Sequence, residues 1–255
     1  MVKETLKSHQ EVLDICLIAG SLMIEGGSEM YRVEDTMMRI AKNSGVPDPR
    51  VFATPTAVFM SMDNGDLSQL KQIRERNINL ELVDRVNNLS RELAAKKITI
   101  DELRQKMLLI NQTPTFPLGL QVIGAAALSA TLMVLFMDNY DWIDFPAAAL
   151  VGALGYLSYS IFKRFTKVRF LSELVAAVVM ALIAIALTYC FKNMISDRII
   201  LGGLMTLVPG LALTNALRDL FMGDLLSGVV RLFEATMTAL ALGGGVAIVI
   251  KFLGA

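Results

Sequence analysis

Residues 118–137 read LGLQVIGAAALSATLMVLFM, a stretch that contains no charged side chain. An α-helix rises 1.5 Å per residue, so a helix of about 20 residues crosses a hydrocarbon core of about 30 Å. This stretch therefore predicts a transmembrane helix. Further apolar stretches of similar length follow it, and the predicted spans are 118–137, 143–162, 170–191, 199–217 and 229–252.

Most charged residues precede residue 112, although the chain as a whole is 54% apolar and 19% charged. A soluble globular domain carries more charge and fewer apolar residues than this chain. Pro114 and Pro117 mark the boundary between the two parts, because proline interrupts a helix. We predict an α-helical integral membrane protein, in which a small helix-rich α+β domain (1–112) precedes a membrane domain with about five transmembrane helices (113–255).

Local signals predict the elements of the N-terminal domain. Ser28 is expected to cap the second helix and Gly45 to end it, because serine and glycine favour these two positions. Thr99 and Glu102 form a capping box that opens a last short helix. The other predicted elements are helices over 8–25, 28–43 and 79–95, and one hairpin with strands over 51–62 and 67–76.

Loop charges predict the orientation of the spans. The loop after the second span is basic and contains Lys163, Arg164, Lys167 and Arg169, whereas the loop after the first span is acidic and contains Asp138, Asp141 and Asp144. Positive loops stay in the cytoplasm. We therefore expect a multi-pass protein of the bacterial inner membrane, with a cytoplasmic N-terminal domain.

Several classes of partner and cofactor are not expected. The formal net charge is zero, so no basic surplus suggests nucleic acid as a partner. Two cysteines and one histidine provide no spacing typical of metal ligands, so no metal site is expected. The GxxxxGK[ST] loop of nucleotide hydrolases is absent, and we predict neither a cofactor nor ATP hydrolysis.

The segment 207–235 is unusually polar for the membrane part of the chain and reads LVPGLALTNALRDLFMGDLLSGVVRLFEA. Pro209 and Gly210 should break the fourth span, and broken helices form the substrate sites of many transporters. The predicted substrate-binding residues are Pro209, Gly210, Asn215, Arg218, Asp219, Asp224, Arg231 and Glu234. The alternative is a packing kink that is followed by an ordinary charged loop.

Within this segment, each polar residue type suggests a role. Arg218 or Arg231 could bind the carboxylate of a substrate. Asp219, Asp224 or Glu234 could bind an amino group or carry a coupling proton.

Small residues recur in two of the predicted spans. Gly152 and Gly155 lie in the second span, and the run 243–245 lies in the fifth. Such residues let helix backbones approach closely, so these glycines are predicted to be helix contacts.

Charged residues also crowd the start of the second predicted helix, where residues 25–41 read EGGSEMYRVEDTMMRIA. A solvated charged face explains them. A hydrolase site with paired carboxylates is the alternative, although no nucleophile motif accompanies it.

Taken together, these segments resemble the threonine/serine exporter family. The resemblance rests on GGSEMYRVEDTMMRIA, on Pro55-Thr56 and on LVPG…NALRDL…GDLLSGVVRLFEA, in this order. It implies export of small polar metabolites rather than enzymatic activity. Some members of the family are short and work with a second small membrane subunit, and such pairs have been linked to export of a dicarboxylate, succinate.

Three functions follow from this reading. The leading one is a secondary exporter of threonine/serine-type amino acids or of a dicarboxylate, which acts with a second small membrane subunit or as a homo-oligomer. A membrane-anchored enzyme would instead carry its site around residues 25–56. A membrane scaffold would use the N-terminal domain as a docking module.

Overall fold

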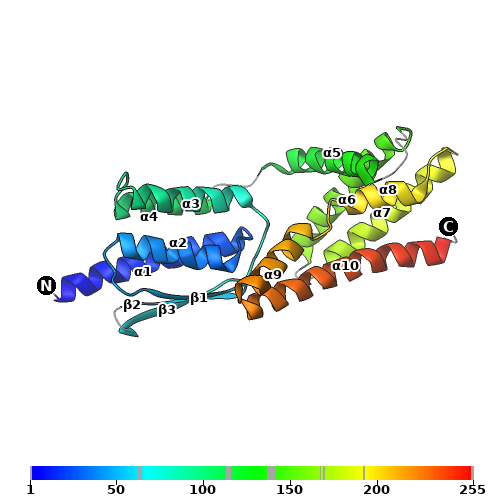
Figure 1. Ribbon diagram of the computed structural model, residues 1–255. Helices are drawn as coiled ribbons and strands as arrows, with labels where there is room; N and C mark the ends of the chain where they lie inside the picture. Colours follow the sequence, from blue (N-terminus) through cyan, green and yellow to red (C-terminus); the bar gives the residue numbers. More distant parts are fainter. Residues whose placement is uncertain are drawn as a thin grey trace. The chain divides into compact units, whose positions relative to one another are not determined.

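The computed structural model describes residues 2–62, 65–112, 116–136, 142–166, 168, 170–191 and 193–253 (Figure 1). Two compact units make up the chain. The first unit consists of Met1–Thr115 and Leu211–Leu232, and the second of Phe116–Gly210 and Phe233–Ala255. Residues 211–232 thus pack with the N-terminal region, although they are far from it in sequence.

The N-terminal region of the first unit is layered. Helices α1 (Val2–Glu25) and α2 (Met30–Asn43) lie between a small sheet and the helices α3 (Leu80–Ala94) and α4 (Ile100–Gln112) (Figure 1). The core between these layers is apolar and includes Leu13, Met23, Ile40, Met60 and Leu103, all fully buried. This arrangement confirms the predicted helix-rich α+β class.

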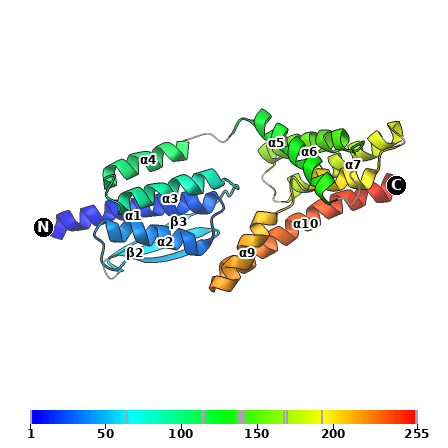
Figure 2. The ribbon, with the colours of Figure 1, turned by 45° about the horizontal axis from the view of Figure 1, so that its top comes forward.

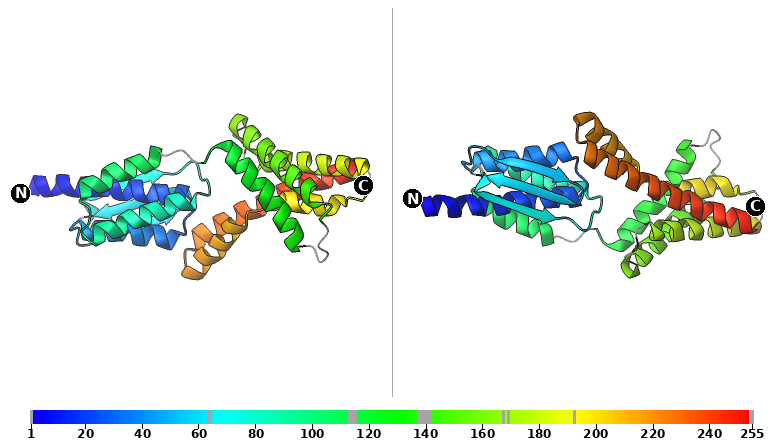
Figure 3. Two further views of the ribbon diagram at one scale, coloured as in Figure 1. Left: turned by 90° about the horizontal axis from the view of Figure 1, so that it is seen from above. Right: turned by 90° about the horizontal axis from the view of Figure 1, so that it is seen from below.

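Three antiparallel strands form the sheet, in the order β1 (Arg50–Thr54), β2 (Ala57–Met62) and β3 (Leu67–Gln72) (Figure 3). The prediction of one strand over 51–62 was wrong, because Pro55 and Thr56 form a turn within it. Proline has no N–H for a ladder hydrogen bond, so it interrupts a strand. The Thr54 hydroxyl closes the turn by donating to the Ala57 carbonyl and accepting from the Ala57 amide.

The turn between α1 and α2 also differs from the prediction. Gly27 adopts φ +86°, and the amide of Ser28 donates to the carbonyl of Met23 at 2.9 Å. This is the hydrogen bond of a Schellman motif, so Ser28 belongs to the end of α1 and does not cap α2. Glu29 takes the N-cap position of α2, where its side chain makes no capping hydrogen bond.

Three other predicted helix ends are confirmed, whereas α1 begins at Val2 and not at residue 8. Gly45 follows α2 with φ +90°, a conformation that glycine adopts without a steric penalty. The Asn79 side chain accepts from the Leu82 amide at the start of α3. Thr99 and Glu102 form the expected capping box at α4, because the Thr99 amide donates to Glu102 at 2.8 Å.

The second unit contains α5 (Leu118–Phe136), α6 (Phe145–Phe165), α7 (Leu171–Cys190), α8 (Ser196–Leu204) and the later part of α10 (Leu225–Leu253). Within the described residues, four helices are long and apolar enough to cross a membrane, namely α5, α6, α7 and α10. This helix composition is that of a multi-pass membrane protein.

The single helix predicted over 199–217 is not present. Two short helices replace it, α8 and α9 (Gly210–Met222), and neither is long enough to be a candidate span. The helix cannot continue through Pro209, which lacks an N–H and disfavours helical backbone at the preceding residue. Gly202 lets α8 approach α5, because a Cβ there would meet the Met133 Cβ at 2.8 Å and the Ser129 carbonyl at 2.9 Å.

Close helix contacts in the second unit depend on glycines, as predicted for Gly152 and Gly155. A Cβ at Gly152 would lie 2.3 Å from the Ser129 Cβ, and one at Gly155 would meet the Met180 side chain. The run 243–245 behaves as expected only at Gly245, which packs against α7. Gly243 has open space where a Cβ would lie.

Replacing Gly152 with alanine should therefore destabilise the second unit. The new Cβ would collide with Cβ and Oγ of Ser129 and with the Ala125 carbonyl oxygen. Overpacking of this kind costs about 1–3 kcal/mol. Detergent-solubilised full-length protein, titrated with a denaturing detergent and followed by circular dichroism, would measure this loss. The matched control is Gly243→Ala, which should leave stability unchanged or slightly raised. Equal stability of the two variants would contradict the packing argument.

Candidate functional site

Helices α9 and α10 form a tight hairpin at the end of the polar segment (Figure 2). Gly223 ends α9 with φ +95°, and the Asp224 amide donates back to the Asp219 carbonyl at 2.9 Å. Gly228 allows the two helices to touch, since a Cβ there would lie 2.5 Å from the Leu220 Cγ. The hairpin therefore holds the polar side chains of both helices close together.

Six side chains gather around residues 27–30, from the start of α2 and from this hairpin, and we call this group the polar cluster. Its side chains are Glu29, Arg32, Asn215, Arg218, Asp219 and Arg231. Three of them bind the backbone of residues 27–30, and the other three pair with one another. All of them belong to the first unit.

Asp219 lies at the centre of the polar cluster and is completely buried. Its Oδ1 accepts a hydrogen bond of 3.1 Å from the amide of Met30, the first residue of α2. A carboxylate is favoured there, because the N-terminus of a helix presents unpaired N–H groups and a partial positive charge. Asp219 therefore caps the N-terminus of α2, although it lies 189 residues further along the sequence. The side chains of Ser28 and Glu29 do not cap this helix.

Arg231 compensates the buried charge of Asp219. Its Nη1 lies 3.3 Å from Oδ2 of Asp219, and its Nη2 donates to the carbonyl of Ser28. Among the described residues, none donates a well-aligned hydrogen bond to Asp219 Oδ2. The contact is therefore mainly an ion pair, and removing either partner would leave an uncompensated charge in the interior.

Asn215 adds a third link to the same turn. Its side-chain amide donates to the carbonyl of Gly27 at 2.8 Å, and the residue is buried. Gly27, Ser28 and Met30 are thus each held by a different side chain of the hairpin. Because buried backbone groups need hydrogen-bond partners, these contacts fix the turn in place.

Glu29 and Arg218 form the more accessible side of the polar cluster. Nη1 of Arg218 donates to Oε1 of Glu29, and Nε of Arg32 lies 3.3 Å from Oε2. Glu29 is 8% exposed, so the prediction of a solvated charged face was wrong for this residue. That prediction describes Asp35 and Arg39 better, since they form a solvent-accessible pair on α2.

Burial determines the electrostatics around the hairpin. It raises the pKa of Asp219, and the opposing effects of Arg231 and the Met30 amide are smaller. Burial likewise raises the pKa of Asp224, against the attraction of Arg231. The pKa of Glu34 is also raised by burial, although its carboxylate accepts a hydrogen bond from the Ala53 amide.

The sequence as a whole identifies the family. It matches the protein family described as "Putative threonine/serine exporter" over residues 14–253. The chain belongs to this family. The resemblance inferred from the sequence motifs is thereby confirmed.

Two curated relatives match this member of the exporter family. One is "Probable threonine/serine exporter" of Mycobacterium tuberculosis, 20% identical over 95% of this chain and 46% of that protein. The other is "Uncharacterized protein C7D4.12c" of Schizosaccharomyces pombe, 22% identical over 96% of this chain and 33% of that protein. The chain thus spans half or less of the length of these relatives. No solved structure matches it.

Four of the residues predicted to bind substrate lie in the polar cluster, namely Asn215, Arg218, Asp219 and Arg231. Asp224 lies beside them at the junction of α9 and α10, where its charge acts on Asp219 and Glu34. The remaining three belong to the second unit: Pro209 and Gly210 at the break before α9, and Glu234 on α10, half-buried.

Sequence reasoning missed Glu29 and the backbone of residues 27–30. The crowding of charges around Glu29 and Arg32 was a visible signal, but it does not indicate a partner 189 residues away. Within the described residues, no group of three or more His, Cys, Asp or Glu side chains could hold a metal ion.

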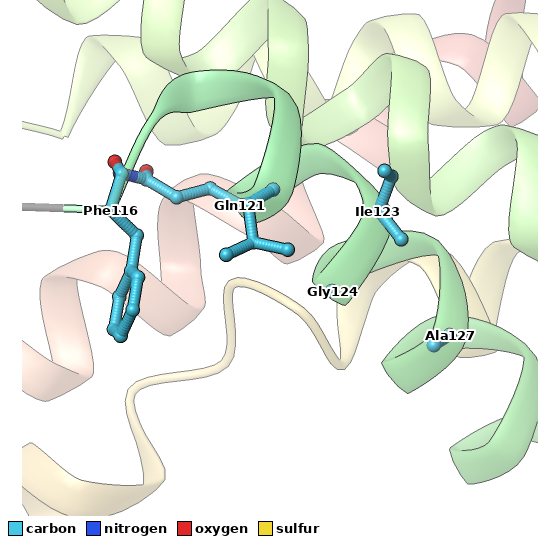
Figure 4. Close-up of a pocket in the computed structure, with 6 residues that line it drawn as sticks. Phe116, Gln121, Ile123, Gly124 and Ala127 are labelled. Atoms are coloured by element: carbon cyan, nitrogen blue, oxygen red, sulfur yellow. The ribbon is translucent and has the colours of Figure 1, made fainter.

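A separate hollow lies on the surface of α5 in the second unit (Figure 4). It measures about 340 Å³ and is lined by Phe116, Leu120, Gln121, Ile123, Gly124 and Ala127. Its polar side chain, Gln121, is already engaged, donating to the Phe116 carbonyl and accepting from the Tyr156 hydroxyl. The lining is otherwise apolar and suits a hydrocarbon environment better than a charged metabolite.

Removing Arg231 should destabilise the first unit strongly. Arg231→Ala leaves Asp219 buried without its cation, and breaking a buried pair in this way costs about 3–5 kcal/mol. Hydrogen–deuterium exchange over residues 26–43 of the full-length protein would report this loss. The control is Arg85→Ala on α3, whose exposed pair with Glu81 should contribute at most about 1 kcal/mol. Similar exchange in both variants would contradict a central role for Arg231.

The pH dependence of this region should reflect the raised pKa of Asp219. The stability that Asp219 contributes is fully present below its unfolded pKa of about 3.9, and it is lost as pH rises through the higher folded pKa. Asp219→Asn does not titrate. Exchange over residues 26–43 should therefore show wild type losing protection relative to Asp219→Asn as pH rises. The opposite slope would mean that the attraction of Arg231 outweighs burial.

Proposed function

We propose that this protein is a subunit of a secondary exporter for small polar metabolites, either threonine/serine-type amino acids or a dicarboxylate such as succinate. The observation that carries the proposal is membership of the exporter family over nearly the whole chain, together with four helices that suit a membrane. Family membership favours a transporter over an enzyme. The name of the Mycobacterium tuberculosis relative, "Probable threonine/serine exporter", supports an amino acid as cargo.

The polar cluster is the proposed substrate region. It offers both signs of charge, which an amino acid or a dicarboxylate with its counter-ion would need. In the structure, Asn215, Asp219 and Arg231 hold the backbone of residues 27–30. We therefore propose that substrate passage involves loosening of these contacts. Asp224 and Glu234 remain the candidates for a coupling proton.

A second membrane chain is the proposed partner. Some members of the family that the chain resembles work with a small second subunit. A second copy of the chain could supply the same complement. Secondary transporters commonly need two related halves around the substrate site, which supports this part of the proposal.

The proposed location is the bacterial inner membrane, with the N-terminal region in the cytoplasm. Lys163 and Arg164 lie in the last turn of α6, and basic groups favour the cytoplasmic side. The other charges behind this prediction, at Lys167, Arg169, Asp138 and Asp141, lie outside the described residues. Asp144 immediately precedes α6, at its opposite end.

Efflux from preloaded cells tests the proposal. Cells would be loaded with labelled threonine, serine or succinate and would express this chain alone or with the small membrane protein encoded next to it. We expect efflux of one cargo class, and only when both chains are present. If neither expression condition exports any of the three labels, with both proteins verified in the membrane, the exporter assignment is wrong.

A further inference from the structure

The carboxylate of Glu29 lies between two arginines. Arg218 of α9 binds one carboxylate oxygen, and Arg32 of α2 lies 3.3 Å from the other. Guanidinium groups are well matched to carboxylates, because their planar N–H groups bind both oxygens in a fixed geometry.

This position is unusual for a residue at the start of a helix. An acidic residue at an N-cap normally binds the amides of its own helix. Glu29 makes no such capping bond, and Asp219 takes the Met30 amide in its place. Within the described residues, the Glu29 carboxylate therefore pairs with the two arginines.

Solvent reaches both arginines but hardly reaches the carboxylate. The side chains of Arg32 and Arg218 are 42% and 46% exposed, whereas that of Glu29 is 10% exposed. Arg231 differs, because it is buried and bound to Ser28 and Asp219. Of the cluster's arginines, Arg32 and Arg218 can thus meet a solute without disruption of the buried ion pair.

We propose that Arg32 and Arg218 form a binding site for small carboxylates, and that the Glu29 side chain is a tethered occupant which a solute carboxylate displaces. The proposal rests on the exporter function and assigns the carboxylate of its cargo to these two arginines. It also selects Arg218 over Arg231 as the arginine of the hairpin that contacts cargo.

The neighbouring contacts make this displacement feasible. Gly27, Ser28 and Met30 are held by Asn215, Arg231 and Asp219, so the turn keeps its position when the Glu29 side chain swings out. Both arginines are open to solvent, so a solute carboxylate can reach them and compete with the tethered group.

Binding of labelled succinate and labelled threonine to the purified full-length protein in nanodiscs tests this inference. Glu29→Gln removes the tethered carboxylate and keeps the size of the side chain. We expect one of the two ligands to bind about fivefold more tightly to this variant than to wild type, because its carboxylate no longer competes with the tethered carboxylate. The double variant Glu29→Gln/Arg218→Gln should lose this gain.

Two controls separate a specific site from a general charge effect. Glu81→Gln on α3 also releases an arginine from an exposed pair, and it should bind both ligands as wild type does. Neutral succinamide should not distinguish Glu29→Gln from wild type. Equal ligand affinity of Glu29→Gln and wild type, or a gain that persists without Arg218, would overturn the inference.

The outcome is independent of the exporter assignment. A chain that exports its cargo while Glu29→Gln shows no gain in affinity retains its proposed function and loses only this site. If Glu29→Gln does not fold, Arg218→Gln in the otherwise unchanged chain gives the same test. Its ligand binding must then fall below that of wild type, and unchanged binding would overturn the site.

Discussion

The hydrogen bond from the Met30 amide to the buried Asp219 carboxylate is the contact on which the first unit depends most. It supplies the missing cap of α2, and it requires Arg231 nearby to compensate a charge that has no access to water. Arg231 in turn binds the Ser28 carbonyl, so that one ion pair satisfies both sides of the turn between α1 and α2. Residues 211–232 consequently pack with the N-terminal region as one compact unit.

The second unit depends on a different constraint, which is the close approach of helices without bulky side chains. Glycines at 152, 155, 202 and 203 occupy positions where a Cβ would collide with a neighbouring helix. The short helix α8 fits among α5, α6 and α7 for this reason. Pro209 then ends any continuation of the helix, and α9 begins anew at Gly210. A stretch that is apolar enough for a span therefore forms two short helices.

For the proposed export function, the contrast between the two sides of the polar cluster matters most. Asp219, Arg231 and Asn215 are buried and bind backbone groups, which suits a structural role. Glu29 pairs with Arg32 and Arg218, and these two arginines, unlike Arg231, are open to solvent. Buried contacts that hold the backbone beside an accessible pair of arginines would suit the proposed binding of a charged metabolite.

The sequence by itself determined the features that depend on neighbouring residues. Apolar runs predicted the helices that suit a membrane, the motif at Thr99 and Glu102 predicted the start of α4, and the ordered motifs identified the exporter family. Pro55 was also a local signal that the first predicted strand would be interrupted, although we predicted one continuous strand there. Only the tertiary structure decided that Asp219 caps α2 and that Glu29 pairs with Arg218. The partners in each contact are 189 residues apart in the sequence. No local sequence pattern indicates which distant side chain will bind a backbone amide that lacks a local cap.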